Sequence, residues 1–207
     1  ARGWCGGGVR CGRVSCSPKG QVSGCRQAGP PPAVDPVNGR GGGHPGGGQG
    51  LGMGLVGPAL RSRAGRPGFA TCTRDVYAAD AKFAPVKAMR IAHGIASVAG
   101  HLHARGIMHG DLYAHNILHD GEGGALLGDF GAASLYDAND RARAAASERL
   151  EVRAFGHLLG ELLERCEPRT WAGRNALDAL AVACLDEAID ARPSFGEIAA
   201  GLAAHTR

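Results

Sequence analysis

The chain has 207 residues, 35 of them glycine, and a formal net charge of +4. No apolar run reaches the roughly 18 residues that a membrane-spanning helix needs, so the sequence excludes a membrane span. The seven cysteines contain no C-x-x-C pair, which gives no zinc-binding spacing and favours a reduced, intracellular protein in the cytoplasm.

The charge and the glycine and proline content divide the chain into two parts. Residues 1–74 carry ten basic residues and a single acid, Asp35, whereas residues 75–207 have a net charge of −5. Glycine and proline dominate the first part, with little apolar periodicity that could build a core. We therefore expect residues 1–50 to be a disordered basic segment and residues 51–207 to form the folded domain. The R-G-G run of this segment lacks interleaved aromatic residues, so nucleic acid is not an expected partner.

A helix is predicted over residues 85–105. Its apolar residues recur every three or four positions, as one face of a helix requires: Ile91, Ile95, Val98 and Leu102. Gly106 ends this helix. The apolar pair at 107–108 then predicts a short strand.

Two polar motifs follow, separated by a predicted hairpin. Residues 109–116 read H-G-D-L-Y-A-H-N, and residues 129–131 read D-F-G. Between them, residues 117–119 and 125–127 are expected strands on either side of a D-G-E-G-G turn. The hairpin would bring the two motifs side by side.

The two motifs resemble the active site of protein kinases, in which a catalytic loop H-R-D-L-x-x-x-N precedes D-F-G. Such enzymes need a carboxylate that orients the attacking hydroxyl and oxygen ligands that hold Mg²⁺ against the phosphates of ATP. By this resemblance Asp111 is the catalytic base and Asn116 a second catalytic residue. Asn116 and Asp129 are the metal ligands, and Leu118 contacts the adenine of ATP.

The resemblance also assigns the histidines. His109 and Phe130 would be packing residues that fix the catalytic loop rather than chemical participants. His101, His103 and His119 are expected on the surface or on a helix face, because no metal-ligand spacing connects them.

The C-terminal part resembles the larger, C-terminal lobe of kinases. Residues 151–163 resemble its buried central helix, with Glu151 in place of the family's Asp. We predict a helix over residues 148–163 that is apolar on most sides and therefore buried. Its expected core residues are Leu150, Phe155, Leu158, Leu159 and Leu162. An Arg-Pro pair at 192–193 resembles the start of the lobe's last helix, for which Ser194 is the expected N-cap.

The nucleotide-binding lobe of kinases is not recognisable. Only 51 residues separate Gly57 from His109, whereas the strands and helices between a glycine loop and the catalytic loop need roughly a hundred. None of the three lysines stands where the nucleotide-binding lysine is expected: Lys19, Lys82 and Lys87. We therefore expect residues 51–56 to be a remnant of the strand that leads into the C-terminal lobe, with most of the first lobe absent.

Further departures concern regulation and substrate. Gly110 replaces the Arg that meets a phosphorylated activation loop in many kinases, so this regulation is not expected. Tyr113 and His115 stand where Ser/Thr kinases place Lys and tyrosine kinases place Arg, which leaves the substrate class open. No A-P-E motif follows D-F-G. Arg192, which pairs with the Glu of that motif in the family, would have Glu148 as its nearest partner.

We therefore predict an α+β fold, a mainly helical protein-kinase-like C-lobe with a short catalytic-loop hairpin, preceded by a disordered Gly/Pro/Arg-rich segment. The resemblance implies a phosphotransferase that uses Mg²⁺ and moves the γ-phosphoryl group of ATP to a hydroxyl of a protein Ser, Thr or Tyr. Two alternatives stay open. One is a small-molecule phosphotransferase similar to aminoglycoside and choline kinases, and the other is a truncated pseudokinase that acts as an interaction scaffold.

Overall fold

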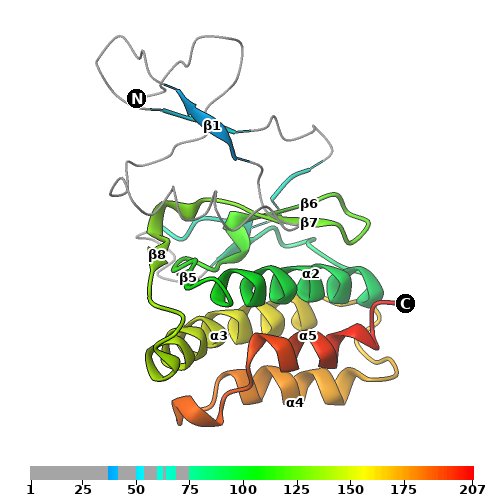
Figure 1. Cartoon of the computed structure of the whole chain (residues 1–207). Helices are drawn as coiled ribbons and strands as arrows, with labels where there is room; N and C mark the ends of the chain where they lie inside the picture. The colour runs from blue at the N-terminus through cyan, green and yellow to red at the C-terminus, as the bar shows by residue number, and fades with distance from the viewer. Residues whose placement is uncertain (1–36, 42–49, 54–59, 63, 69–74) are drawn as a thin grey trace.

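The computed structural model describes residues 37–41, 50–53, 60–62, 64–68 and 75–207 (Figure 1). This part of the chain combines long helices with short, antiparallel two-stranded sheets, so the predicted α+β class is confirmed. Within it, no helix has both the length and the apolar character that crossing a membrane requires.

Two strands precede the main body of the described chain. β1 (Val37–Gly41) pairs antiparallel with β2 (Gly50–Met53). β1 falls inside residues 1–50, where disorder is predicted, and the rest of that segment lies outside the described residues except for the first residue of β2. β2 covers the start of the expected remnant strand at 51–56, whose residues 54–56 also lie outside the described part. Both expectations therefore stay predictions.

Helix α2 (Pro85–His103) lies between the small sheets and the other helices (Figure 1). Pro85 stands in the first turn, where its missing N–H costs little. After the helix, Gly106 adopts φ +69, and a Cβ there would collide with the carbonyl oxygen of Tyr136. The chain then enters β5 (Ile107–Met108). The predicted helix, its glycine stop and the strand after it are confirmed.

Helix α3 (Arg141–Glu164) runs through the helical layer and begins seven residues before the predicted start at 148. Asp140 caps it, because its carboxylate accepts the N–H of Arg143 at 3.1 Å. The buried apolar residues form one stripe: Val152, Phe155, Leu158, Leu159, Leu162 and Leu163. Leu150 lies off this stripe and is 53% exposed, so its expected place in the core is wrong.

Two further helices complete the layer: α4 (Arg174–Cys184) and α5 (Phe195–Ala203). Ser194 caps α5 as predicted. Its hydroxyl accepts the N–H of Glu197, whose carboxylate accepts the N–H of Ser194 in return, which is a capping box. Phe195 packs its ring edge-on against Phe155 with 5.8 Å between centroids, so the cap and the core meet at this point.

Arg192 is buried and its partners are backbone carbonyl oxygens. Its Nε donates to the oxygen of Asp186 at 2.7 Å and its Nη1 to the oxygen of Arg149 at 3.0 Å. The carboxylate of Glu148 instead accepts the N–H of Phe195 at 2.9 Å. The expected pairing of Arg192 with Glu148 is therefore wrong, because Arg192 donates to backbone oxygens after α4 and in α3, whereas Glu148 accepts a backbone N–H at the start of α5.

Short strands position the candidate site. They pair antiparallel as β3 (Ala64–Gly65) with β4 (Val76–Tyr77), β5 with β8 (Ser134–Leu135), and β6 (Ile117–His119) with β7 (Ala125–Leu127). The β6–β7 hairpin has the predicted strands. Asp120 holds its turn, because the carboxylate accepts the N–H groups of Glu122 and Gly124.

Candidate active site

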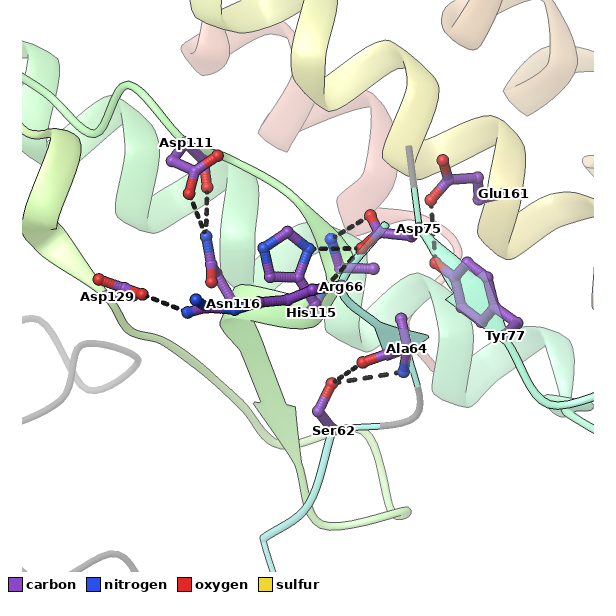
Figure 2. A network of polar contacts seen from close by, with 11 residues as sticks. Ser62, Ala64, Arg66, Asp75, Tyr77, Asp111, His115, Asn116, Asp129 and Glu161 are labelled. Carbon is purple, nitrogen blue, oxygen red and sulfur yellow. Dashed lines mark hydrogen bonds and ion pairs between the residues drawn. The ribbon is translucent and has the colours of Figure 1, made fainter. Parts of the chain in front are cut away.

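The first motif brings Asp111 and Asn116 together. Gly110 turns the chain with φ +78, where a Cβ would press against the carbonyl oxygen of Ala132. The turn η1 (Ala114–Asn116) then carries the Asn116 amide back, and its Nδ2 donates to the backbone oxygen of Asp111 at 2.8 Å and to Oδ2 at 2.9 Å (Figure 2). These bonds orient the Asp111 carboxylate and turn the amide oxygen of Asn116 away from it.

Asp129 lies beside this pair because the hairpin returns the chain. The N–H of Gly128 donates to the carbonyl oxygen of Asn116 at 2.9 Å. Asp129 itself has φ 54, a left-handed conformation that Asp tolerates through local hydrogen bonds, here from the N–H of Gly131 to Oδ1 at 3.4 Å. Its side chain is 31% exposed, and Oδ2 lies 2.6 Å from Nη2 of Arg66 (Figure 2).

His109 fixes the backbone between the two motifs. Its buried ring accepts the N–H of Asp111 at Nδ1 over 3.3 Å, so Nε2 carries the proton that is donated to the carbonyl oxygen of Gly128 over 2.9 Å. The ring also packs edge-on against Phe130 with 4.8 Å between centroids. The packing role that the resemblance implies for His109 and Phe130 is confirmed.

Glu151 is a buried acid beneath the catalytic loop, and the sequence analysis missed its role. Its Oε1 accepts the N–H of Gly110 at 2.7 Å, and its Oε2 accepts the N–H of His109 at 3.2 Å and lies 2.7 Å from Nε2 of His103. Burial raises the pKa of Glu151, but the hydrogen bond and charge of His103, together with the loop groups, hold that pKa below its usual range. The signal that could have revealed this role is helical spacing, because Glu151 stands four and seven positions before Phe155 and Leu158, on the apolar face of the helix.

Two of the histidines expected on the surface or on a helix face are buried. His103 lies between Glu151 and Tyr136, with its Nδ1 2.7 Å from the hydroxyl oxygen of Tyr136. His119 packs edge-on against Phe83 with 5.7 Å between ring centroids. The expectation for His119 is wrong, because this residue lies on β6 and its ring is covered by a segment distant in the sequence. His103 does lie on a helix, at the end of α2, but its ring faces the interior.

Asp75 anchors the catalytic loop from a second side. Its carboxylate, which has no exposed area, accepts the N–H groups of Ala114 at 2.9 Å and of His115 at 3.1 Å, and it lies 2.6 Å from Nδ1 of His115 (Figure 2). The sequence analysis missed this residue. About forty positions separate Asp75 from its partners, and no local pattern connects them.

The β3–β4 pair carries two groups to the site together. Gly65 pairs with Val76, so Arg66 follows the last residue of β3 at the end where Asp75 precedes β4. Asp75 reaches the catalytic loop, while Arg66 reaches Asp129. One short ribbon therefore contacts both motifs.

Leu118 is half-buried on β6. Side chains alternate along a strand, so Leu118 points to the opposite face from its buried neighbours Ile117 and His119. Its contact with adenine stays a prediction.

The donor groups fit Mg²⁺. The amide oxygen of Asn116 and the carboxylate of Asp129 are oxygen ligands, and Mg²⁺ in nucleotide sites is held by one or two protein groups together with substrate phosphates. The guanidinium of Arg66 at Asp129 shows that this carboxylate is accessible to positive charge. Among the described residues, no three His, Cys, Asp or Glu side chains gather as metal ligands, so the remaining ligands would be phosphate and water oxygens.

The fold and the site resemble those of the protein-kinase-like superfamily, and the comparisons with known proteins support this class. The chain belongs to the lipopolysaccharide kinase (Kdo/WaaP) family, whose model matches residues 72–177. The matched stretch contains both polar motifs, their hairpin and the whole of α3.

Short stretches of curated protein kinases are also similar. A serine/threonine-protein kinase AtPK1/AtPK6 of Arabidopsis thaliana is 49% identical over 47 residues, which cover 23% of this chain and 10% of that protein. Kinase suppressor of Ras 2 of Homo sapiens is 32% identical over 84 residues, which cover 41% of this chain and 9% of that protein. The matched stretches thus span about a tenth of the length of these relatives.

Proposed function

We propose that this chain moves the γ-phosphoryl group of ATP to a hydroxyl group. The observation that carries the proposal is the arrangement of Asp111, Asn116 and Asp129, an oriented carboxylate beside two oxygen ligands (Figure 2). Phosphoryl transfer needs these parts because its catalysis depends on positioning and on stabilising charge. Membership of a kinase family supports the same reaction.

Each residue of the site has a defined task in this reaction. The Asp111 carboxylate accepts the proton of the acceptor hydroxyl as the hydroxyl oxygen bonds to the γ-phosphorus and the bond to the ADP oxygen breaks. Asn116 keeps that carboxylate in one orientation through Nδ2. Asn116 and Asp129 would hold Mg²⁺, which neutralises phosphate charge when bound. Glu151 and Asp75 position the loop by holding its N–H groups from two sides.

We propose a saccharide hydroxyl as the acceptor. The name of the matching family points to a saccharide-containing acceptor. The segment after Asp129 is also short, because α3 begins at Arg141 after one turn and a two-residue strand. In protein kinases a longer segment ending in A-P-E stands at this place. A shorter segment leaves less surface on which a protein substrate could dock.

A protein hydroxyl is the second candidate acceptor. The 47-residue similarity to a serine/threonine-protein kinase favours it. The test for both candidates is the transfer of label from γ-labelled ATP, with Mg²⁺, to a lipopolysaccharide core oligosaccharide or to an unfolded protein rich in Ser, Thr and Tyr. We expect label in the oligosaccharide, whereas label in the protein alone would establish the second candidate.

Two matched variants test whether the phosphoryl transfer takes place at this site. Asp111→Asn should abolish labelling, because the amide cannot accept the proton. Asp190→Asn makes the same change of charge in the exposed turn η3 (Ile189–Ala191) and should label as the parent does. A parent chain that labels neither acceptor and binds no Mg-ATP would contradict the proposal and favour the scaffold alternative.

A further inference from the structure

A guanidinium group, and not an ammonium group, faces the candidate metal ligand. Nη2 of Arg66 lies 2.6 Å from Oδ2 of Asp129 (Figure 2). The two lysines in the described part of the chain form ion pairs elsewhere: Lys82 with Glu167 at 3.0 Å and Lys87 with Glu122 at 2.8 Å. Arg66 is therefore a cation that the described residues bring to this site, and neither described lysine does so.

The ribbon that carries Arg66 is held at both of its strands. Tyr77 on β4 donates its hydroxyl to Glu161 of α3 at 3.0 Å. Burial, together with the charge of Glu161, raises the pKa of Tyr77, so the phenol keeps the proton that it donates. Before β3, the backbone of Arg61 pairs with that of His119 on β6 through two hydrogen bonds of 3.1 Å. Two supports thus hold the ribbon that places Arg66 beside Asp129.

The contact between Arg66 and Asp129 is easily exchanged. The two side chains are 62% and 31% exposed, and solvent screens ion pairs of this kind, so they contribute little to stability. Mg²⁺ bound at Asp129 would compensate the carboxylate charge and repel the guanidinium. The guanidinium would still be close to the nucleotide, because Asp129 would hold the Mg²⁺ that neutralises the phosphates.

We propose that Arg66 binds the phosphate groups of the nucleotide, the task that a strand lysine has in protein kinases. A planar guanidinium can donate two parallel N–H bonds to two phosphate oxygens, which a point-like ammonium cannot do. Without nucleotide, Arg66 neutralises Asp129, and with Mg-ATP bound it contacts phosphate. This inference rests on the proposed function, because it requires Mg-ATP in the same site.

The test compares the affinity of the full chain for ATP and for adenosine by calorimetry in Mg²⁺. Arg66→Ala should weaken ATP binding by about tenfold to a hundredfold, as expected for a lost charged hydrogen bond. Arg66→Lys should weaken it less, since it keeps the charge and loses the paired donors. Neither change should alter adenosine binding, because adenosine has no phosphate. Arg153→Ala removes the same charge from the exposed face of α3 and should bind ATP as the parent does.

Three results would overturn the inference. Equal ATP affinity of Arg66→Ala and the parent would leave Arg66 without a role in binding. Tighter ATP binding by Arg66→Ala would make it a group that blocks the metal ligand. A parent that binds no ATP would contradict the proposed function as well, which distinguishes that failure from the first two. If Arg66→Ala fails to fold, the test uses Arg66→Lys and compares its ratio of ATP affinity to adenosine affinity with that of the parent. An unchanged ratio would contradict phosphate binding by Arg66.

Discussion

Replacing Glu151 by Ala should remove the support beneath the catalytic loop and lower the free energy of unfolding by about 3–5 kcal/mol. The side chain is only 1% exposed, and its two oxygens face the N–H groups of Gly110 and His109 and the ring of His103. Once the carboxylate is gone, the N–H of His109 and the ring of His103 stay buried without their acceptor, which is the costly situation for a buried charged pair. The loss is a large part of the roughly 5–15 kcal/mol that stabilises a typical domain.

Urea unfolding measures this loss as a lower midpoint with an unchanged slope. Glu164→Ala is the matched control, because Glu164 ends the same helix with a side chain that is 74% exposed. It should change the free energy of unfolding by less than about 0.5 kcal/mol. If Glu151→Ala stays within about 1 kcal/mol of the parent, the argument that this carboxylate supports the loop is refuted.

The same carboxylate predicts how stability depends on pH. Its pKa in the folded chain lies below the ordinary value of 4.5, so on acidification the unfolded chain takes up the proton first. The contribution of Glu151 is therefore complete above that ordinary value and is lost as the pH falls through the folded pKa. Urea midpoints at pH 7 and pH 4 should differ more for the parent than for Glu151→Gln. An equal difference in urea midpoint for the two proteins would contradict the predicted loss of the Glu151 contribution at low pH.

Two other predictions test the core and the second anchor of the loop. Phe155→Ala should lower the free energy of unfolding, measured in urea, by about 3–5 kcal/mol. Leu150→Ala, at an exposed position of the same helix, should lower it by less than about 0.5 kcal/mol. Equal losses would contradict the stripe of buried residues on α3. Asp75→Ala should lower the rate of phosphoryl transfer by about tenfold or more, because the catalytic loop would be misplaced. Asp80→Ala, in the exposed turn nearby, should leave the rate unchanged. Similar rates for both variants would show that Asp75 does not position the loop.

Elements whose causes are local could be predicted from the sequence. The β6–β7 hairpin has its apolar strands and its glycine-rich turn within eleven consecutive residues, and both strands formed as predicted. The cap of α5 is equally local, because Ser194 and Glu197 stand three positions apart. The two polar motifs meet because the hairpin between them is short. The hydrogen bond between Asp111 and Asn116 is also local, because the two residues stand five positions apart in the first motif.

Features that depend on tertiary contacts could not be read in this way. The burial of His103 requires Tyr136 and Glu151, which lie 33 and 48 positions away. Leu150 is apolar, but only the packing of α3 against its neighbours decides which side of that helix faces water. Asp75 and Arg66 reach the site through a ribbon of two-residue strands, which are too short to give a hydrophobic pattern.

The central claim is that the two motifs form one Mg²⁺-dependent nucleotide site, and the most direct measurement is a calorimetric titration of the chain with ATP, with and without Mg²⁺. The account predicts that the parent binds ATP more tightly with Mg²⁺ and that Asp129→Asn loses this dependence, because the amide is a poorer ligand for a hard cation than a carboxylate. Equal ATP affinity of the parent with and without Mg²⁺ would contradict this claim. An unchanged Mg²⁺ dependence of ATP affinity in Asp129→Asn would contradict it as well.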